Sequence, residues 1–468
     1  MSEREKCDAP LPEESEVSLQ STQAPLTARV PDTPVLAGAG AHAIPDPDDE
    51  EPCPRRVQSF LFLVPLLLVV ASAVFLIVYF STHRTVEVVP TSLFSEGLLP
   101  VAITEVDAES GEEQLLWGYI DRGGNTVIEH QFEAAKDFSA VGLAAVKKDG
   151  KWGFINRSGT FVIEPQYEDA QGFAEFNFAC VRFAGSWGYI NQKGEMIINP
   201  QFDSAEAFTD IGLAMVEIGG KYGYINRTGV YVIPPQYENA RSFDAEGHAA
   251  VLAFGKWGMI DKNGEYFINP QFDRLDSFAG GDLALICKDE MYGYINKEGV
   301  YVVRPTYEYA EAFADNGLAL IRVNGKYGYI NKKGEIAIAP ELEAARSFAD
   351  SGLAAACRDG LWGFINKNGE FTIEPTYYTV SDFMYDRAVV RLNAEDPYMC
   401  IDKDGKIAFT CDESCLLPGT FFDDGYTLFF YEDENGEMVA TIVNRDGVAL
   451  NKTRYAAVSE RVLASFGK

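Results

Sequence analysis

The stretch KWGFIN, residues 151–156, carries an aromatic residue followed by glycine, and this pair returns every 35 residues along most of the chain. The aromatic members of the pairs are Trp117, Trp152, Trp187, Tyr222, Trp257, Tyr292, Tyr327 and Trp362. After each one, isoleucine follows at the third position, Asn or Asp at the fourth, glycine at the seventh and, in all copies but the first, proline at the thirteenth. Such a period is typical of supersecondary units stacked side by side, none of which buries its apolar face alone.

Each unit contains three short runs of β-forming residues, which in the unit around Trp152 are 143–147, 151–156 and 160–163. The dipeptide Asp149-Gly150 between the first two runs is a hairpin signal, and an Asn-x-x-Gly turn separates the second from the third. The unit is therefore predicted to be a three-stranded antiparallel meander.

Proline has no amide to donate to a ladder, so Pro165 is expected to end the third strand. The connector that follows is expected to fill the joint between units with its recurring apolar residues. These are Tyr167, Ala170 and Phe173.

The middle strand is apolar on both faces, because Trp152 and Phe154 point to one side and Ile155 to the other. Sheets packed face to face, like the blades of a propeller, would cover both faces, and Gly153 would allow their close approach. An open β-solenoid or superhelix of the same units is the alternative. The motif decays around residues 398–405 and 443–447, and counting these two degenerate copies gives ten units.

The aromatic-glycine pair, the Ile-Asn/Asp step and the proline resemble the WG-repeat family of bacteria over roughly residues 94–455. The resemblance implies an all-β repeat array, often behind a single membrane helix, and no common activity. The first unit departs from the pattern, because an acidic loop at 102–116 replaces its tight first hairpin and His130 stands in place of proline.

Ahead of the array, residues 1–56 are acidic and proline-rich without an apolar period, which predicts a disordered tail. A transmembrane helix is predicted at 57–81, because residues 60–80 are 21 residues without a charge and span a bilayer core of about 30 Å. A linker (82–93) leads into the β array (94–468). Arg55 and Arg56 precede the helix, so the tail is expected in the cytoplasm and the repeats outside it.

The sequence offers few residues that could form a catalytic, metal-binding or nucleic-acid-binding site. A net charge of −31 disfavours binding to nucleic acid. His130 and His248 are the only histidines of the array and lie more than three repeats apart, which disfavours a metal or acid-base site. Asp402 begins a segment similar to a calcium loop, but Lys406 and Ile407 occupy places that need an oxygen ligand and glycine, so a hairpin turn is expected. No catalytic, cofactor-binding or metal-binding residue is predicted.

Six cysteines lie beyond the predicted membrane helix, and an even number outside the cytoplasm permits disulfides in 15 connectivities. Three of them take positions of small core residues. The other three cluster in the least regular units, where a disulfide would stabilise the fold most. The first set is Cys180, Cys287 and Cys357; the second is Cys400, Cys411 and Cys415.

These observations together favour a non-enzymatic binding or scaffold protein tethered to the membrane, with an unknown protein or cell-envelope ligand and no cofactor. One alternative is a sensor that relays an outside contact to the cytoplasmic tail. Another is an enzyme of propeller type acting on envelope polymers, which would need polar residues that break the repeat together in neighbouring units.

Overall fold

The computed structural model describes residues 92–106, 111, 113–278, 281–419 and 421–466, all within one compact unit, Tyr79–Lys468. The predicted tail, the predicted transmembrane helix and the linker up to residue 91 lie outside the described residues. Within the described ranges, no helix has the length and apolar character needed to cross a membrane.

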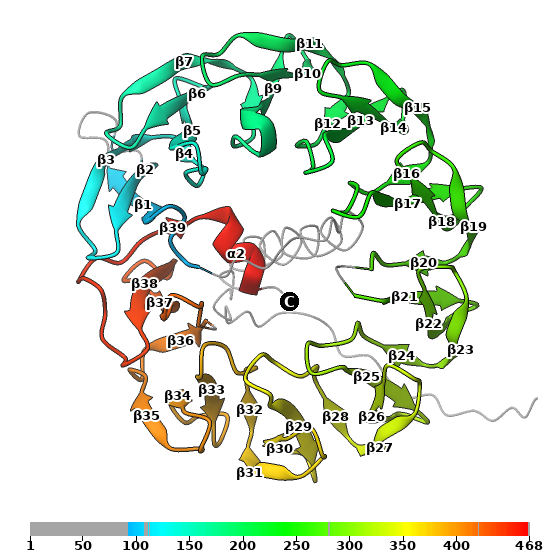
Figure 1. Ribbon diagram of the computed structural model, residues 1–468. Helices are drawn as coiled ribbons and strands as arrows, with labels where there is room; N and C mark the ends of the chain where they lie inside the picture. The colour runs from blue at the N-terminus through cyan, green and yellow to red at the C-terminus, as the bar shows by residue number, and fades with distance from the viewer. Residues whose placement is uncertain (1–91, 107–110, 112, 279–280, 420, 467–468) are drawn as a thin grey trace, which may run out of the picture. The chain divides into compact units, whose positions relative to one another are not determined.

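The described part of the chain is almost entirely strand and forms ten small antiparallel sheets, which we call blades 1 to 10. Figure 1 shows these blades around a ring; in blades 2 to 10 the first strand of each sheet lies nearest the centre and the last lies at the rim. Blade 2 is representative. From the inside outward it consists of β4 (Ala134–Ala135), β5 (Leu143–Lys148), β6 (Lys151–Asn156) and β7 (Phe161–Tyr167).

Blades 3 to 8 follow in chain order, each with a two-residue inner strand. Blade 3 contains β8 (Asp169–Ala170), the 3-10 turn η1 (Glu175–Asn177), β9 (Ala179–Phe183), β10 (Ser186–Ile190) and β11 (Met196–Phe202). Blade 4 contains β12 (Ser204–Ala205), β13 (Leu213–Ile218), β14 (Lys221–Asn226) and β15 (Tyr231–Tyr237), and blade 5 contains β16 (Asn239–Ala240), β17 (His248–Ala253), β18 (Lys256–Asp261) and β19 (Tyr266–Phe272). Blade 6 contains β20 (Arg274–Leu275), β21 (Leu283–Lys288), β22 (Met291–Asn296) and β23 (Tyr301–Tyr307), and blade 7 contains β24 (Tyr309–Ala310), β25 (Leu318–Val323), β26 (Lys326–Asn331) and β27 (Ile336–Leu342). Blade 8 contains β28 (Ala344–Ala345), β29 (Ala354–Arg358), β30 (Leu361–Ile365) and β31 (Phe371–Tyr377).

The last two blades and the first are less regular. Blade 9 contains β32 (Thr379–Val380), β33 (Ala388–Arg391), β34 (Met399–Ile401) and β35 (Ile407–Thr410), and blade 10 contains β36 (Cys415–Pro418), β37 (Tyr426–Glu432) and β38 (Met438–Asn444). Blade 1 contains β1 (Leu98–Val106), β2 (Glu113–Asp121) and β3 (Thr126–Phe132), and its inner strand is β39 (Ala457–Val458), which precedes α2 (Glu460–Phe466).

The C-terminal strand closes the ring. β39 pairs with β1, and the amide of Ala456 donates to the carbonyl of Ala102 at 2.9 Å. Ten clusters of buried apolar side chains fill the joints, one between each pair of neighbouring blades. One of them joins Leu99 of blade 1 to Leu428 and Ile442 of blade 10. The propeller prediction is therefore confirmed, and the open solenoid or superhelix is wrong.

The joint between blades 2 and 3 shows how the repeat packs. Phe154 and Phe173 are buried, with ring centroids 4.9 Å apart, and Phe173 belongs to the connector that enters blade 3. On the opposite face of blade 2, Ile155 is buried against blade 1. Both faces of the middle strand are thus covered, as predicted, and each fully buried aromatic or aliphatic side chain contributes about 2 to 3 kcal/mol.

Two details of the predicted unit are wrong. Every sheet except that of blade 10 has four strands, because connector residues such as Asp169–Ala170 form the inner strand of the next blade. Pro165 lies inside β7 and does not end it. β7 is the edge strand of its blade, where proline is tolerated, and a bulge opposite Gly153 removes the need for a ladder bond there.

The glycine of each aromatic-glycine pair is required within its own sheet. A Cβ on Gly153 would lie 2.7 Å from the carbonyl oxygen of Ile163 and 2.7 Å from the nitrogen of Pro165. The close approach is therefore to the outer strand across the bulge, and the expectation that it serves packing between sheets is corrected. Gly159, in the turn before β7, has φ +80° and packs against Ile128 of the preceding blade.

Candidate functional site

The two histidines of the array are not brought together. His130 lies in β3 of blade 1, and burial lowers the pKa of its imidazole. His248 begins β17 of blade 5, with its ring 4.7 Å from that of Phe267 and its Nδ1 3.8 Å from Asp244 Oδ2. Among the residues that the structure describes, no group of three or more His, Cys, Asp or Glu side chains gathers as a metal site would require.

The segment that begins at Asp402 forms the hairpin turn between β34 and β35, as predicted. One carboxylate oxygen of Asp402 accepts hydrogen bonds from the amides of Asp404 and Lys406, at 3.0 and 2.9 Å. This side chain is thus engaged by the backbone of its own turn, like the Asn at the same place in other blades.

A carboxylate that recurs just after the outer strand has a structural role that sequence reasoning missed. Glu133 Oε1 accepts a hydrogen bond from the amide of Gly150, at the tip of the hairpin between β5 and β6, at 2.9 Å. The signal was available, because an acidic residue stands at this place in seven successive units. The equivalent pairs are Glu168 with Gly185, Asp203 with Gly219, Glu238 with Phe254, Asp273 with Asp289, Glu308 with Gly325 and Glu343 with Gly360.

A tyrosine two places after the repeated aromatic ties neighbouring blades together. Tyr224 is fully buried in blade 4, and its hydroxyl donates to the carbonyl of Arg241 in blade 5 at 2.7 Å. Burial raises the pKa of this phenol well above its ordinary value. The same bond recurs from Tyr119 to Lys136, Tyr189 to Glu206, Tyr294 to Glu311 and Tyr329 to Arg346.

Polar residues that differ from blade to blade line the inner edges of the ring. Arg241 of blade 5 pairs with Asp276 of blade 6 at 3.4 Å, and Arg274 pairs with the same carboxylate at 2.9 Å. Arg346 of blade 8 reaches Asp382 of blade 9 at 3.5 Å. Burial raises the pKa of the Asp382 carboxyl, and Arg346 opposes that effect. The contacts of Arg241 and Arg346 bridge neighbouring blades, and Arg274 orients Asp276 within blade 6, so we assign all three first to holding the inner wall together.

All six cysteines of the described part are free and buried. The small core positions predicted for Cys180, Cys287 and Cys357 are confirmed, since these side chains sit inside the blades. Cys411 and Cys415 meet in the joint between blades 9 and 10, where their thiols interact through a hydrogen bond that raises the pKa of Cys411 and lowers that of Cys415.

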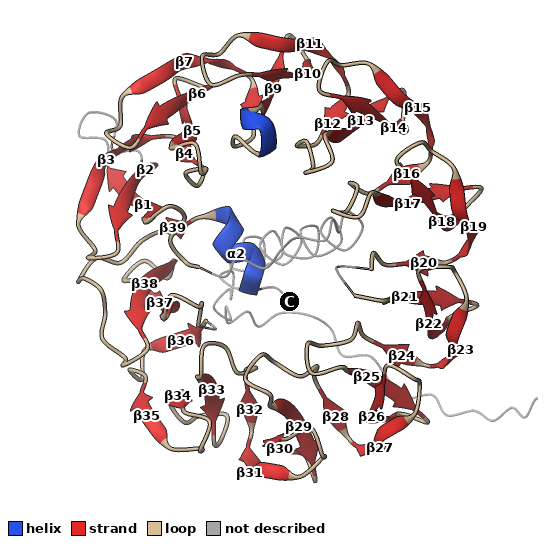
Figure 2. Ribbon diagram, viewed as in Figure 1, coloured by secondary structure: helices blue, strands red, loops and turns tan. Residues whose placement is uncertain are grey.

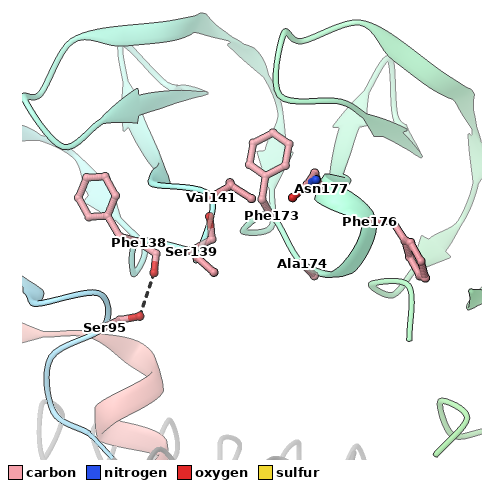
Figure 3. A pocket seen from close by; sticks show the side chains of 9 residues that line it. Ser95, Phe138, Ser139, Val141, Phe173, Ala174, Phe176 and Asn177 are labelled. Atoms are coloured by element: carbon pink, nitrogen blue, oxygen red, sulfur yellow. Dashed lines mark hydrogen bonds between the residues drawn. The ribbon is translucent and has the colours of Figure 1, made fainter. Parts of the chain in front are cut away.

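One pocket of about 380 Å³ opens between the inner loops of blades 2 and 3. Val141 and Phe173 lie next to each other in its wall, and the 3-10 turn that carries Asn177 borders it (Figure 3). Ser95 Oγ donates to the carbonyl of Phe138 at 2.8 Å, so that hydroxyl is already satisfied. The pocket has no titratable side chain in its wall and offers contact to an apolar or uncharged group.

The lip of this pocket breaks the repeat. Phe176 has a φ angle of +59°, whereas Val141 at the same place in blade 2 has no positive φ. Asn177, with φ +61°, keeps the positive φ that Gly142 has at its place in blade 2, which is +77°. Positive φ is uncommon for a bulky residue and concentrates at binding sites. The Arg227 guanidinium from blade 4 lies 4.4 Å from the Phe176 ring centroid and holds this side chain in place.

Several solved structures are similar to parts of this chain. One is a eukaryotic initiation factor, at 12% identity over 78% of this chain and 97% of that one, with a TM-score of 0.46. Streptogramin B lyase matches at 15% identity over 47% and 88%, with a TM-score of 0.26. Kluyveromyces lactis Hsv2p matches at 11% identity over 52% of this chain and 92% of that one, with a TM-score of 0.29. No curated protein matches the chain.

The chain matches the sequence profile of one protein family, described as WG containing repeat, in eight consecutive copies. The matched residues are 117–152, 152–185, 187–222, 222–253, 257–292, 292–327, 327–362 and 362–394, which is more than half of the chain. The aromatic-glycine pairs, the turn glycines and the prolines of these copies are the residues that build the blades. The chain therefore belongs to the WG containing repeat family.

Proposed function

We propose that this protein is a non-enzymatic, membrane-tethered scaffold that binds a protein or cell-envelope ligand outside the cytoplasm. The observation that carries the binding role is the pocket between blades 2 and 3, whose lip holds Phe176 with a φ of +59°, where Val141 and Ile211 stand without positive φ in the blades on either side. Its wall carries no titratable side chain, and its two serine hydroxyls, Ser95 and Ser139, each donate to a backbone carbonyl, which favours holding a group over transforming it.

The tether and its orientation rest on the sequence. Residues 60–80 form an uncharged apolar run of 21 residues, and Arg55 and Arg56 stand on its N-terminal side. Protease added to the outer face of intact cells or spheroplasts should remove the repeats and spare the tail. Digestion of the tail alone would contradict the proposed orientation.

The binding role is tested by giving blade 3 the loop residues of blade 2, as the double variant Phe176→Val and Asn177→Gly in the full chain. Because valine and glycine suit this loop in blade 2, we expect the melting temperature to be unchanged or higher. Cross-linking in intact cells, followed by mass spectrometry, should show loss of the ligand captured by wild type. Equal capture by the variant would contradict binding at this pocket.

The control variant is Ile211→Val in blade 4, which occupies the equivalent loop place without positive φ. It should leave both capture and melting temperature unchanged. The sensor alternative would be favoured if the tail cross-links to a cytoplasmic protein and if the extent of this cross-linking changes when the outside ligand is added.

A further inference from the structure

The hairpin between the second and third strands of each blade ends in a two-residue tip, and these tips differ along the ring. They emerge at the end of the strands opposite to the pocket, because the pocket loop precedes β5 and the tip follows it. In four blades the first tip residue is polar, as Asp149, Asp289, Asn324 and Asp359. In the three consecutive blades 3, 4 and 5 it is Ala184, Gly219 and Phe254.

The side chains around these three tips make an apolar surface. Phe254 is 92% exposed, and Phe183 and Ile218, which end the strands leading into the neighbouring tips, are 44% and 37% exposed. The residues equivalent to Phe183 in blades 2 and 6 are Lys148 and Lys288. Three exposed apolar side chains on adjacent hairpins mark an interaction surface more often than single scattered ones do.

Phe254 is also in a conformation that its residue type disfavours. Its φ is +56°, where Asn324 and Asp149 are tolerated because their short polar side chains suit this region. The phenylalanine ring gains no core contact in return, since it is almost fully exposed. A residue that serves neither the turn nor the core is a candidate for function.

Carboxylates surround the apolar tips. Glu168, Asp203 and Glu238 each accept a hydrogen bond from a tip amide, at 3.0, 2.7 and 3.0 Å. These bonds use only part of each carboxylate's capacity to accept hydrogen bonds. Glu217 adds a fourth negative charge next to Ile218. The cations beside these tips are Arg182, which pairs with Glu168 at 3.9 Å, Lys221, and Lys256, which pairs with Asp273 of blade 6. With Asp273 included, five carboxylates stand against three cations. A partner with cationic side chains beside its apolar ones would therefore be favoured over an acidic one.

We propose that the tips of blades 3 to 5, with Phe183, Ile218 and Phe254, form a second docking surface, which binds a protein segment carrying an aromatic or aliphatic side chain next to lysine or arginine. This surface lies on the face of the ring opposite to the pocket, so the scaffold can hold two ligands at once. Its test is independent of the pocket.

The test uses the variant Phe254→Asn in the full chain, with two synthetic peptides as probes. The peptides share alternating phenylalanine and leucine residues, separated by lysine in one and by glutamate in the other. Wild type should bind the lysine peptide and not the glutamate peptide, and Phe254→Asn should weaken that binding by about tenfold or more. The melting temperature of Phe254→Asn should be equal to or above that of wild type, because Asn relieves the disfavoured φ.

The matched control is Leu361→Asn, which removes a 39% exposed apolar side chain beside the tip of blade 8. It should leave peptide binding unchanged. The proposal is overturned if Phe254→Asn binds the lysine peptide as wild type does, if the glutamate peptide binds equally well, or if the variant is less stable than wild type, which would make Phe254 a structural residue.

Discussion

Replacing Tyr224 by phenylalanine removes one hydroxyl from the joint between blades 4 and 5 and leaves the ring in place. The side chain is fully buried, and its ring centroid lies 4.6 Å from that of Phe243. The lost hydroxyl donates to the carbonyl of Arg241 at 2.7 Å, so the variant leaves that partly buried acceptor without this donor. An unsatisfied buried group of this kind costs about 1 to 3 kcal/mol.

The assay is equilibrium unfolding in urea, followed by fluorescence. We expect the midpoint to fall while the slope stays unchanged, because the variant alters stability and not the surface exposed on unfolding. The control is Tyr231→Phe, whose ring is 37% exposed on the outer strand and which should change the free energy of unfolding by less than about 0.5 kcal/mol. An unchanged midpoint for Tyr224→Phe would refute the role of the tyrosine as a tie between blades.

Three further predictions concern single positions. Gly258→Ala should lower the melting temperature by more than about 5 °C, because the added Cβ would lie 2.6 Å from the carbonyl oxygen of Ile268, whereas Gly172→Ala, with open space around it, should not. Trp257→Ala should cost less than the roughly 3 to 5 kcal/mol of a fully buried aromatic, since its ring is only half-buried; a larger shift in the urea midpoint would contradict this. Burial raises the pKa of Cys400 to about 12, so at pH 8 alkylation measured by intact mass should require denaturant, and rapid labelling of the native protein would argue against the buried thiol.

Much of the blade could be predicted from the sequence, because its signals are local. The middle strand β6 has the predicted bounds, Lys151–Asn156, and the tip at Asp149-Gly150 is the expected hairpin with positive φ at both residues. The inner strand Asp169–Ala170 was missed because two residues carry no periodic pattern. Closure was left open because it depends on the pairing of Ala457–Val458 with β1, which lies more than 350 residues earlier in the chain.

The candidate binding surfaces were harder to predict than the fold. Phe254 counts as an ordinary hydrophobic residue until its φ of +56° and its exposure are known. Phe176 likewise stands at a place whose residue varies from blade to blade, and it is distinguished only by its positive φ beside a pocket. The tie from Tyr224 was missed because a tyrosine in an apolar strand is indistinguishable from a core aromatic without the position of its hydroxyl.

Both proposed binding surfaces depend on the closure of the ten blades into a ring. Electron microscopy of the purified full chain tests this closure most directly. The structure predicts axial projections with ten radial units around a closed ring, the tenth joined to the first by β39. An open arc, a spiral, or a closed ring with a different number of units would contradict it.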